Sequence, residues 1–321
     1  MTSSAESAPP AGARAVVTGA SGFVGSHLCE RLAQLGVDVT ALVRPGTDRR
    51  RLDGAGDGVR VVELDLADPD ADLAPAVRGA GAVYHLAAAG VDQSRSDAAA
   101  IVAVNVAGTV RLLQAAAGAG VSRFVYCGSC FEYPAGHGLT EDVLPCPATE
   151  YAASKAAGWL MAGAFARRHG LPVVSLRPFT VYGPREAPGR LVPEAVGRAL
   201  RSLPVETTSG RQTRDLVYVA DAVEAFVAAW RNGAPGETFN VCTGTATTVR
   251  QAVELVLEIT GSPAGARFGA RPDRAGELYE LTGDPTRARE GLGWSASTGV
   301  REGLERTVAW WRDRLAVGTR G

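Results

Sequence analysis

The alternation of short apolar runs with helix-like segments constrains the fold of this chain more than any other feature. The first apolar run, residues 13–19, leads into a glycine-rich turn, and helical spacing follows over residues 23–36. Further runs of strand length occupy residues 37–44, 58–66, 81–90, 122–129 and 172–178. Longer helical segments separate some of these runs, at residues 98–118 and 151–169. Strands that alternate with helices at this spacing indicate a parallel, doubly wound α/β sheet.

Three glycines stand where the first predicted strand meets the first predicted helix. Gly19, Gly22 and Gly25 follow the strand directly and open the helix. Backbone N–H groups at a helix N-terminus attract a pyrophosphate, and side chains there would keep it away. The position therefore favours a dinucleotide-binding turn of the Rossmann type. A tight strand–helix turn without a ligand is the alternative interpretation of the same residues.

The second predicted strand ends in an arginine, where dinucleotide sites usually place an acid. Arg44 occupies that position, and an arginine there can accept a ribose 2′-phosphate. We therefore favour NADP(H) as the cofactor. NAD is the alternative, because Arg44 can also be an ordinary solvated side chain. Asp65 and Leu66, at the end of the third strand, are predicted to border the adenine.

Lys155 is the only lysine of the chain, although arginines are frequent. It follows Tyr151 by four residues, so the two side chains share one face of the predicted helix. A tyrosine phenol titrates at about pH 10 in water, and a neighbouring ammonium, aided by an oxidised nicotinamide, lowers that pKa. The compact ammonium can also hydrogen-bond a cofactor ribose, which a guanidinium does poorly. The pair predicts a tyrosine that exchanges a proton with the substrate; the alternative is a surface lysine.

A serine at the end of the preceding strand supplies a third polar group. Ser129 closes the run at residues 122–129, so its hydroxyl is expected in the cleft at the C-terminal edge of the sheet. There it would hydrogen-bond the reacting substrate oxygen and hold it against Tyr151. An ordinary strand-end serine in a local turn is the alternative.

The composition limits the partners and the compartment. The net charge of −1 offers no basic face to nucleic acid, and the longest apolar run is too short to cross a membrane, so neither partner is expected. The five cysteines form an odd and scattered set, which predicts reduced thiols and a cytoplasmic location. The four histidines lack metal-ligand spacing, so no metal is expected.

The order of these motifs along the chain resembles one known family. From about residue 13 to residue 315 the chain is similar to the extended short-chain dehydrogenases/reductases, and among them to the nucleotide-sugar epimerases, dehydratases and reductases. The shared motifs include TGASGFVG, LDL, HLAA, NVAGT, RFVYCGS, YAASK, RPFTVYGP and GRQTRDLVYVAD. The resemblance implies the catalytic set Ser129, Tyr151 and Lys155. It implies cofactor contacts from Gly19, Gly22, Phe23, Val24, Gly25, Asp65, Leu66, Leu86, Ala87, Ala88, Asn105, Tyr151, Lys155 and Phe179.

The resemblance also assigns a nucleotide-sugar substrate and the residues that would bind it. Arg214 and Arg274 match the two arginines with which the family holds the substrate diphosphate, and guanidiniums suit this task as bidentate clamps. Leu191 and Val192 fall where the nucleotide base is usually held. Thr180 stands where the family commonly has asparagine, so the substrate contact there departs from the family pattern.

A second departure follows the catalytic serine. The sugar 4,6-dehydratases of the family carry Asp-Glu at this point, and this chain has Cys130 and Phe131. Neither side chain can move the protons that loss of water requires. Glu132 comes one residue later and would face away from the site if the strand continued. Dehydration is therefore not expected.

The motifs also divide the chain. We expect a dinucleotide-binding domain at residues 13–178, to which residues 215–242 return. Residues 179–214 and 243–321 are expected to form a smaller C-terminal substrate lobe. Residues 1–12, which are small, polar and proline-containing, are predicted to be a disordered tail.

Together these features predict an enzyme that moves a hydride between a nicotinamide and C4 of a nucleotide-activated hexose. Arg44 favours an NADP(H)-dependent 4-ketoreductase, which would consume one NADPH in each turnover. An NAD-dependent 4-epimerase that keeps its cofactor is the alternative. A non-catalytic NADP-binding sensor or scaffold is an alternative of another class. The family pattern also implies a homodimer, paired through the helices at residues 98–118 and 151–169.

Overall fold

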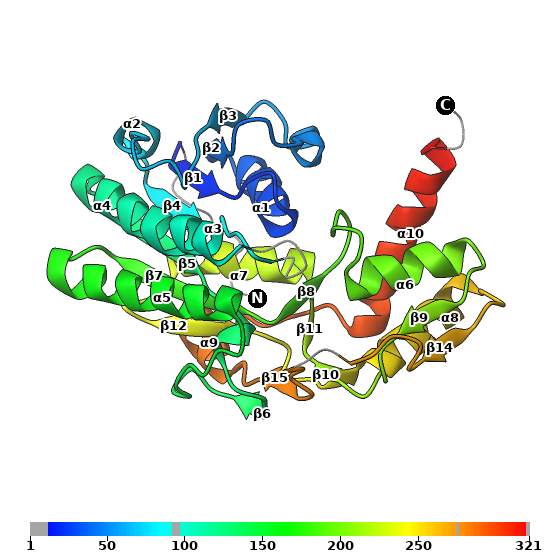
Figure 1. The fold of residues 1–321 in the computed structure, drawn as a ribbon. Coiled ribbons are helices and arrows are strands. Elements are labelled where there is room, and N and C mark those ends of the chain that lie inside the picture. Colours follow the sequence, from blue (N-terminus) through cyan, green and yellow to red (C-terminus); the bar gives the residue numbers. More distant parts are fainter. Residues whose placement is uncertain (1–11, 92–96, 274–275, 319–321) are drawn as a thin grey trace, which may run out of the picture.

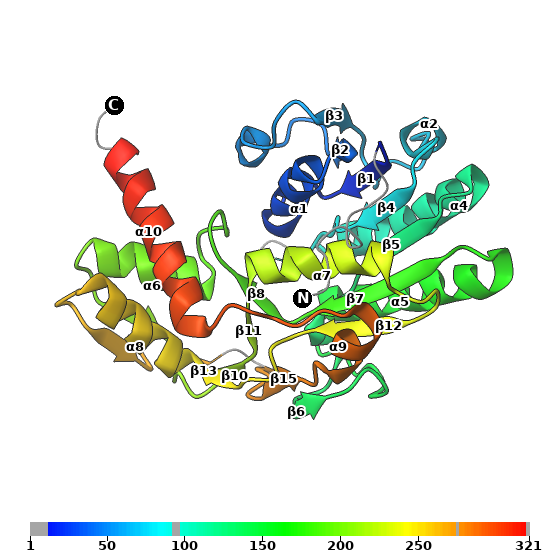
Figure 2. The same cartoon turned by 180° about the vertical axis from the view of Figure 1, so that it is seen from behind.

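A computed structural model describes residues 12–91, 97–273 and 276–318 of the 321-residue chain. Its centre is a seven-stranded sheet in which all neighbouring strands are parallel, and helices cover both of its faces (Figures 1 and 2). The predicted doubly wound Rossmann sheet is confirmed. The tail predicted at residues 1–12 lies outside the described residues, except for Gly12.

Each of the six predicted strand runs contains one strand of this sheet, and a seventh strand comes later in the chain. The strands are β1 (Arg14–Thr18), β2 (Asp38–Val43), β3 (Val59–Glu63), β4 (Ala82–His85), β5 (Arg123–Cys127), β7 (Val173–Pro178) and β12 (Thr238–Val241). In space they follow the order β12-β7-β5-β4-β1-β2-β3. β4 is buried along its whole length, because a central parallel strand is covered on both faces. The strand order reverses between β1 and β4, which is where open α/β sheets bind ligands.

The two faces of the sheet carry different helices. One face holds α1 (Phe23–Gln34) and α7 (Val219–Arg231), and the other holds α2 (Ala74–Val77), α4 (Thr109–Ala119) and α5 (Glu150–His169) (Figures 1 and 2). The predicted helix at residues 98–118 is continuous in space. It consists of α3 (Ala98–Val102), a π-helical turn η3 (Ala103–Gly108) and then α4.

The helical stretch Ala98–Ala119 is apolar and only partly covered. Its mean hydropathy reaches 1.5 over its most apolar window, and 33% of that window is buried. By length and composition alone, it is the one helix among the described residues that could cross a membrane, although helices packed against a core pass the same test. One of its side chains, Val102, is 55% exposed.

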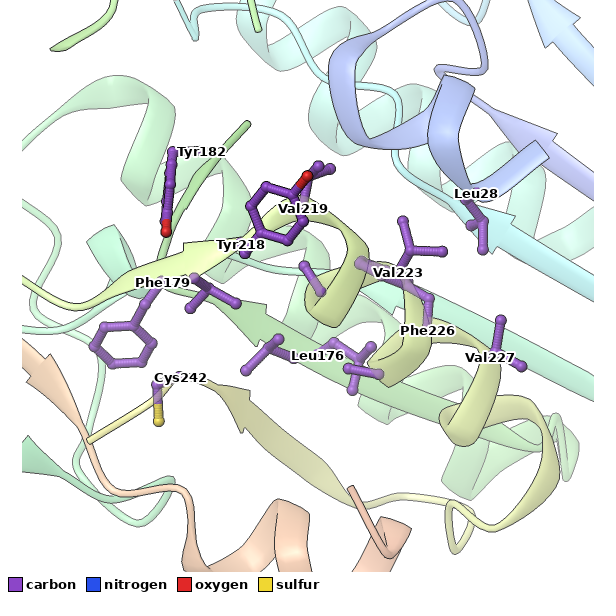
Figure 3. Packing of buried hydrophobic residues seen from close by; sticks show 14 of the residues in the cluster. Leu28, Leu176, Phe179, Tyr182, Tyr218, Val219, Val223, Phe226, Val227 and Cys242 are labelled. Atoms are coloured by element: carbon purple, nitrogen blue, oxygen red, sulfur yellow. The ribbon is translucent and has the colours of Figure 1, made fainter. Parts of the chain in front are cut away.

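A smaller lobe lies beyond the C-terminal ends of the strands (Figure 1). It contains α6 (Leu191–Leu200), α8 (Val249–Thr260), α10 (Val300–Gly318) and the short strands β9 (Val205–Thr207), β10 (Thr213–Arg214), β13 (Thr247–Thr248) and β14 (Ala266–Phe268). A parallel pair, β8 (Thr180–Tyr182) with β11 (Leu216–Tyr218), connects this lobe to the sheet. The two parts share one buried core, which contains Tyr182 and Tyr218 as well as Leu176 and Phe226 (Figure 3).

The observed division differs from the predicted one at one place. Residues 219–241 return to the sheet through α7 and β12. However, β15 (Leu281–Gly283) pairs with β6 (Gly136–Leu139), and α9 (Thr286–Leu292) packs against β12 and α7. This part of the predicted substrate lobe therefore lies beside the sheet, because its apolar residues complete the core at the edge strand β12.

Candidate active site

The turn after β1 accepts only glycine at its key positions. Gly19 has a φ of 68°, and a Cβ on it would come 2.7 Å from the backbone nitrogen of Ala87. A Cβ on Gly25 would overlap the carbonyl oxygen of Gly19. These glycines let the turn, the first helix and the end of β4 approach one another closely.

No side chain caps the N-terminus of α1. The N-cap is Gly22, and the first turn contains no acidic residue. The first N–H groups of a helix have no acceptor within the helix, so those of Phe23, Val24 and Gly25 can bind an anion. The turn therefore fits the pyrophosphate of a dinucleotide, as the sequence predicts.

A buried histidine that the sequence analysis missed joins the ends of β1 and β4. The Nδ1 atom of His85 lies 2.8 Å from the Thr18 hydroxyl, and its Nε2 atom lies 2.7 Å from the Thr109 hydroxyl. Burial lowers the pKa of His85 to about 3, so the ring is neutral. Thr18 also accepts the N–H of Ala87 at 3.1 Å, which places the backbone of Leu86 to Ala88 at the edge of the sheet.

Asn105 uses its side chain to fix neighbouring segments. Its Oδ1 atom accepts the N–H of Ala89 at 2.7 Å, and its Nδ2 atom donates to the Ala89 carbonyl at 3.0 Å and to the Ser154 hydroxyl at 2.8 Å. Ser154 in turn donates to the carbonyl of Tyr151 at 2.7 Å. Asn105, predicted to bind the cofactor, thus connects the loop after β4 to the helix that carries Tyr151.

The residues predicted to surround the adenosine lie at the ends of β2 and β3. Arg44 is exposed directly after β2, and within the described parts of the chain it forms no ion pair. Its neighbour Arg49 pairs with Glu63 instead. Asp65 accepts the N–H of Ala67 at 2.8 Å, so its carboxylate closes the turn after β3. Leu66 beside it is buried in the core.

The chain turns sharply at Ser129. β5 ends at Cys127, and residues Cys130–Glu132 form a short 3₁₀ helix, η4, with Ser129 as its N-cap. The Ser129 hydroxyl accepts the N–H of Phe131 at 3.3 Å. It also lies close enough to the phenol of Tyr151 to lower the pKa of that group.

Helix α5 brings the predicted tyrosine and lysine into the same place. Thr149 caps the helix by accepting the N–H of Ala152 at 3.2 Å. Tyr151 is half-buried in the first turn. Lys155 is only 2% exposed, and its Nζ atom lies 4.7 Å from the centre of the Tyr126 ring. The interpretation of Lys155 as a surface lysine is therefore wrong.

The pKa of Tyr151 is raised, whereas the sequence predicts that Lys155 lowers it. Burial is the largest cause that raises the pKa of Tyr151, the Cys127 thiol adds to it, and the hydrogen bond with Ser129 lowers it. Burial lowers the pKa of Lys155, while Cys127 and Glu132 raise it. The lowering of the Tyr151 pKa by Lys155 remains a prediction.

Glu132 does not face away from the site, as an extended strand would require. The 3₁₀ turn brings its carboxylate back, so that Oε1 accepts the N–H of Ser129 at 2.8 Å. Its Oε2 atom lies 2.9 Å from Nε of Arg177, and both side chains are fully buried. The sequence analysis missed this pair because 45 residues separate its members.

The predicted substrate side is partly assembled. Arg214 donates to the carbonyl of Leu278 at 2.7 Å and to Oε1 of Glu277 at 2.5 Å. Its guanidinium is thus already held by protein groups, and a diphosphate contact there stays a prediction. Thr180 is half-buried in β8. Arg274 lies outside the described residues.

Three apolar residues predicted to touch a ligand have different positions. Leu191 is half-buried and Val192 buried at the start of α6, where no side chain caps the helix. The ring of Phe179 lies in the core, with its centroid 6.3 Å from that of Tyr133, and Figure 3 shows it near Cys242. A contact between Phe179 and a nicotinamide would therefore be made by its backbone.

A loop after β8 ties the second lobe to the first, which the sequence analysis also missed. Arg185 has a φ of 68° and donates to Glu30 at 2.7 Å and to the carbonyl of Arg51 at 3.1 Å. Its Nε atom lies 3.3 Å from Nε2 of His27. Burial and then Arg185 lower the pKa of His27 to about 4, so this ring is a neutral acceptor.

Known proteins similar to this chain include nucleotide-sugar epimerases. The sequence model described as "NAD dependent epimerase/dehydratase family" matches residues 15–242. A UDP-glucose 4-epimerase of Mycolicibacterium smegmatis is 35% identical over 94% of this chain and 99% of its own length.

Two solved structures have the same fold. UDP-glucose 4-epimerase of Thermotoga maritima, solved with UDP-glucose, has a TM-score of 0.87 and 30% identity, covering 94% of this chain and 99% of its own. MoeE5, solved with UDP-glucuronic acid and NAD, has a TM-score of 0.84 and 35% identity, with the same coverage of 94% and 99%. The resemblance inferred from the motifs is confirmed.

Proposed function

We propose that this chain, which belongs to the NAD dependent epimerase/dehydratase family, is an NAD-dependent 4-epimerase of a UDP-sugar. As a member of this family the protein is an enzyme, so the alternative of a non-catalytic sensor or scaffold is wrong. The observation that carries the proposal is the convergence of Ser129, Tyr151 and a buried Lys155 beside the glycine turn.

The residues of the site divide the work of epimerisation. NAD, with its pyrophosphate at the N-terminus of α1, would take up the hydride of the sugar C4 and return it. Tyr151 removes the proton of the C4 hydroxyl during oxidation. It returns a proton to the same oxygen after the 4-keto-sugar has rotated to present its other face to the nicotinamide. Ser129 hydrogen-bonds the same oxygen and holds it against the phenol. Lys155 supplies a positive charge one helical turn away, which opposes the effect of burial on the Tyr151 pKa.

Dehydration is the other reaction in the family description, and the residues after Ser129 argue against it. Cys130 is 1% exposed, and burial raises the pKa of its thiol to about 12. Phe131 carries no ionisable group. Glu132 is held by the backbone of Ser129 and by Arg177, so it is not available to the sugar. The protons that loss of water requires have no carrier at these positions.

The 4-ketoreductase favoured by the sequence becomes the second candidate. Its support is the exposed Arg44 after β2, which suits a 2′-phosphate and therefore NADP(H). The relatives argue the other way: they include 4-epimerases, and a similar solved structure contains NAD. We therefore give precedence to the epimerase, which keeps one nicotinamide through the whole reaction.

We also propose that a second copy covers the outer face of α4 and α5. Leu160 on α5 is 59% exposed, and the α4 stretch is apolar but mostly uncovered. A hollow between the two helices is lined by Gln114, Met161, Ala164, Phe165, Arg168 and His169. An apolar face of this kind favours an oligomer. Light scattering should give a dimer mass for the wild type and a monomer mass for Leu160→Glu; a monomeric wild type would contradict the proposal.

Product analysis tests the enzymatic proposal. The purified protein should convert UDP-glucose into its C4 epimer without added cofactor, and denaturation should release NAD. A protein that is free of NAD and oxidises added NADPH in proportion to a 4-keto-sugar would instead be the reductase.

A further inference from the structure

A buried ion pair lies directly behind Ser129 and has no part in the mechanism above. Glu132 and Arg177 are both fully buried, with Oε2 and Nε 2.9 Å apart. The other carboxylate oxygen, Oε1, accepts the N–H of Ser129 at 2.8 Å. A single side chain thus joins the catalytic serine to a fixed charge on β7.

We propose that Glu132 is a positioning residue for the reaction, which holds the backbone of Ser129 while Arg177 holds Glu132. This inference rests on the proposed function, because it concerns the hydroxyl that meets the substrate oxygen. A hydroxyl displaced by about 1 Å can cost on the order of a hundredfold in rate. The pair would keep that displacement from occurring.

Close contacts surround the Glu132 carboxylate and the Arg177 guanidinium. A Cβ on Gly128 would come 2.6 Å from Oε1 of Glu132, so glycine is required for its approach. Arg177 donates to the hydroxyl of Tyr133 at 2.8 Å. The rings of Tyr133 and Trp159 lie 4.7 Å and 4.5 Å from its guanidinium carbon. A guanidinium fixed in this way also fixes the carboxylate that it binds.

Stability alone does not explain such a pair. Removing two charges from water costs free energy that their attraction only partly offsets, and apolar replacements are often equally stable. Burial raises the pKa of Glu132 above its ordinary value, although the Arg177 guanidinium and the Ser129 N–H oppose the rise. The location next to Ser129 is better explained by the geometry that the pair fixes.

Glu132 also affects the pKa of Tyr151. The groups around this phenol include Tyr126 and Cys127 of β5 and Ser129, Cys130 and Glu132 from the turn after it. Lys155 follows one helical turn later on α5. Burial is the main cause of the raised pKa of Tyr151, and the charge of Glu132 raises it further. Without that charge, Tyr151 should lose its proton at a lower pH.

Glu132→Gln tests the inference, because it removes the charge with little change in shape. We expect kcat to fall about 10- to 100-fold with KM nearly unchanged. We also expect the rise of kcat/KM with pH to move to lower pH, which a purely structural role would not cause. Hydrogen exchange at the Ser129 amide should become at least about tenfold faster, because the amide loses its charged acceptor.

A second variant guards against misfolding. Glu132→Gln combined with Arg177→Met removes both buried charges and should fold, while keeping the shifted pH profile and the faster exchange. The matched control is Asp221→Asn, which changes a buried carboxylate of α7 that accepts Ser297 Oγ and Thr298 N at 2.9 Å each. The control should lose stability with its pH profile unmoved.

The outcomes separate the two proposals. An active wild type with a folded Glu132→Gln variant of unchanged kcat, pH profile and Ser129 exchange would overturn the role of Glu132. A wild type without epimerase turnover would overturn the proposed function alone. In that case hydrogen exchange at the Ser129 amide of Glu132→Gln still tests the positioning role. Faster exchange than in the wild type supports this role, and unchanged exchange overturns it.

Discussion

Two turns leave the same edge of the sheet, and they are built in opposite ways. In the turn after β1, Gly22 caps α1 without a side chain, and the left-handed φ of Gly19 lets β4 approach. In the turn after β5, Ser129 caps a 3₁₀ helix and Glu132 closes back onto the Ser129 N–H. In the first turn no side chain caps the start of α1, whereas side chains of the second turn accept the N–H groups of Ser129 and Phe131.

The difference follows from what each turn must do. A pyrophosphate is bound by backbone donors that have no other acceptor, so the first turn works because side chains are missing. A hydroxyl that takes part in proton transfer must be held in one position. The second turn therefore needs side chains that fix the position of Ser129. Binding and chemistry are therefore separable by mutation.

The largest expected effect is the loss of kcat when Tyr151, which exchanges the substrate proton, is replaced. Tyr151→Phe keeps the ring but removes the proton that is exchanged, so kcat should fall by roughly 10²–10⁴-fold. Dinucleotide binding should stay within a few fold of wild type in a fluorescence titration. Near-normal turnover in this variant would remove Tyr151 from the mechanism and with it the division between the two turns.

Gly25→Ala should produce the reverse pattern. Its Cβ would overlap the carbonyl oxygen of Gly19 and displace the donors at the start of α1. Loss of one charge-assisted hydrogen bond to phosphate is worth about 1.5–3 kcal/mol, so the dinucleotide Kd should rise about 10- to 100-fold. The control is Gly118→Ala in α4, where a Cβ meets nothing within 4 Å. It should stabilise the fold by about 0.5–1 kcal/mol and leave the Kd unchanged; equal Kd values in both variants would refute the role of the glycine turn.

The smallest effect concerns cofactor choice. If Arg44 accepts a 2′-phosphate, Arg44→Asp should weaken NADPH binding by about tenfold and favour NADH, because a carboxylate repels phosphate and accepts ribose hydroxyls. If the protein is the proposed epimerase, the wild type should already bind NAD well and the substitution should change its Kd little. Kd values for both dinucleotides, measured by calorimetry, distinguish the two, and a strong wild-type preference for NADPH would revive the reductase.

The two turns also show which features the sequence could predict. Local spacing predicted the glycine turn and placed Ser129, Tyr151 and Lys155 at one edge of the sheet, because strand ends and helix faces follow from period and order. The reversal of Glu132 was missed, since it depends on where β5 stops and on a partner in β7. Contacts of this kind form only when distant segments pack, and no local pattern encodes them.

The same limit explains the other differences. His85 reads as one apolar-run residue in VYHLAA, yet it joins Thr18 and Thr109 across two other elements. Arg185 adopts a left-handed φ that arginine rarely takes, and three contacts to the first lobe hold it there. Arg214, predicted to bind the substrate diphosphate, pairs with Glu277, which is 63 residues away.

The central claim, that one nicotinamide takes and returns a hydride at C4, is tested most directly with UDP-glucose carrying deuterium at C4. The purified protein is incubated with this sugar and no added cofactor, and the product is examined by mass spectrometry and NMR. The account predicts the C4 epimer with the deuterium still on C4 and the mass unchanged. A product that has lost water, with the label on another carbon, or the absence of any product until NADPH and a 4-keto-sugar are supplied, would contradict it.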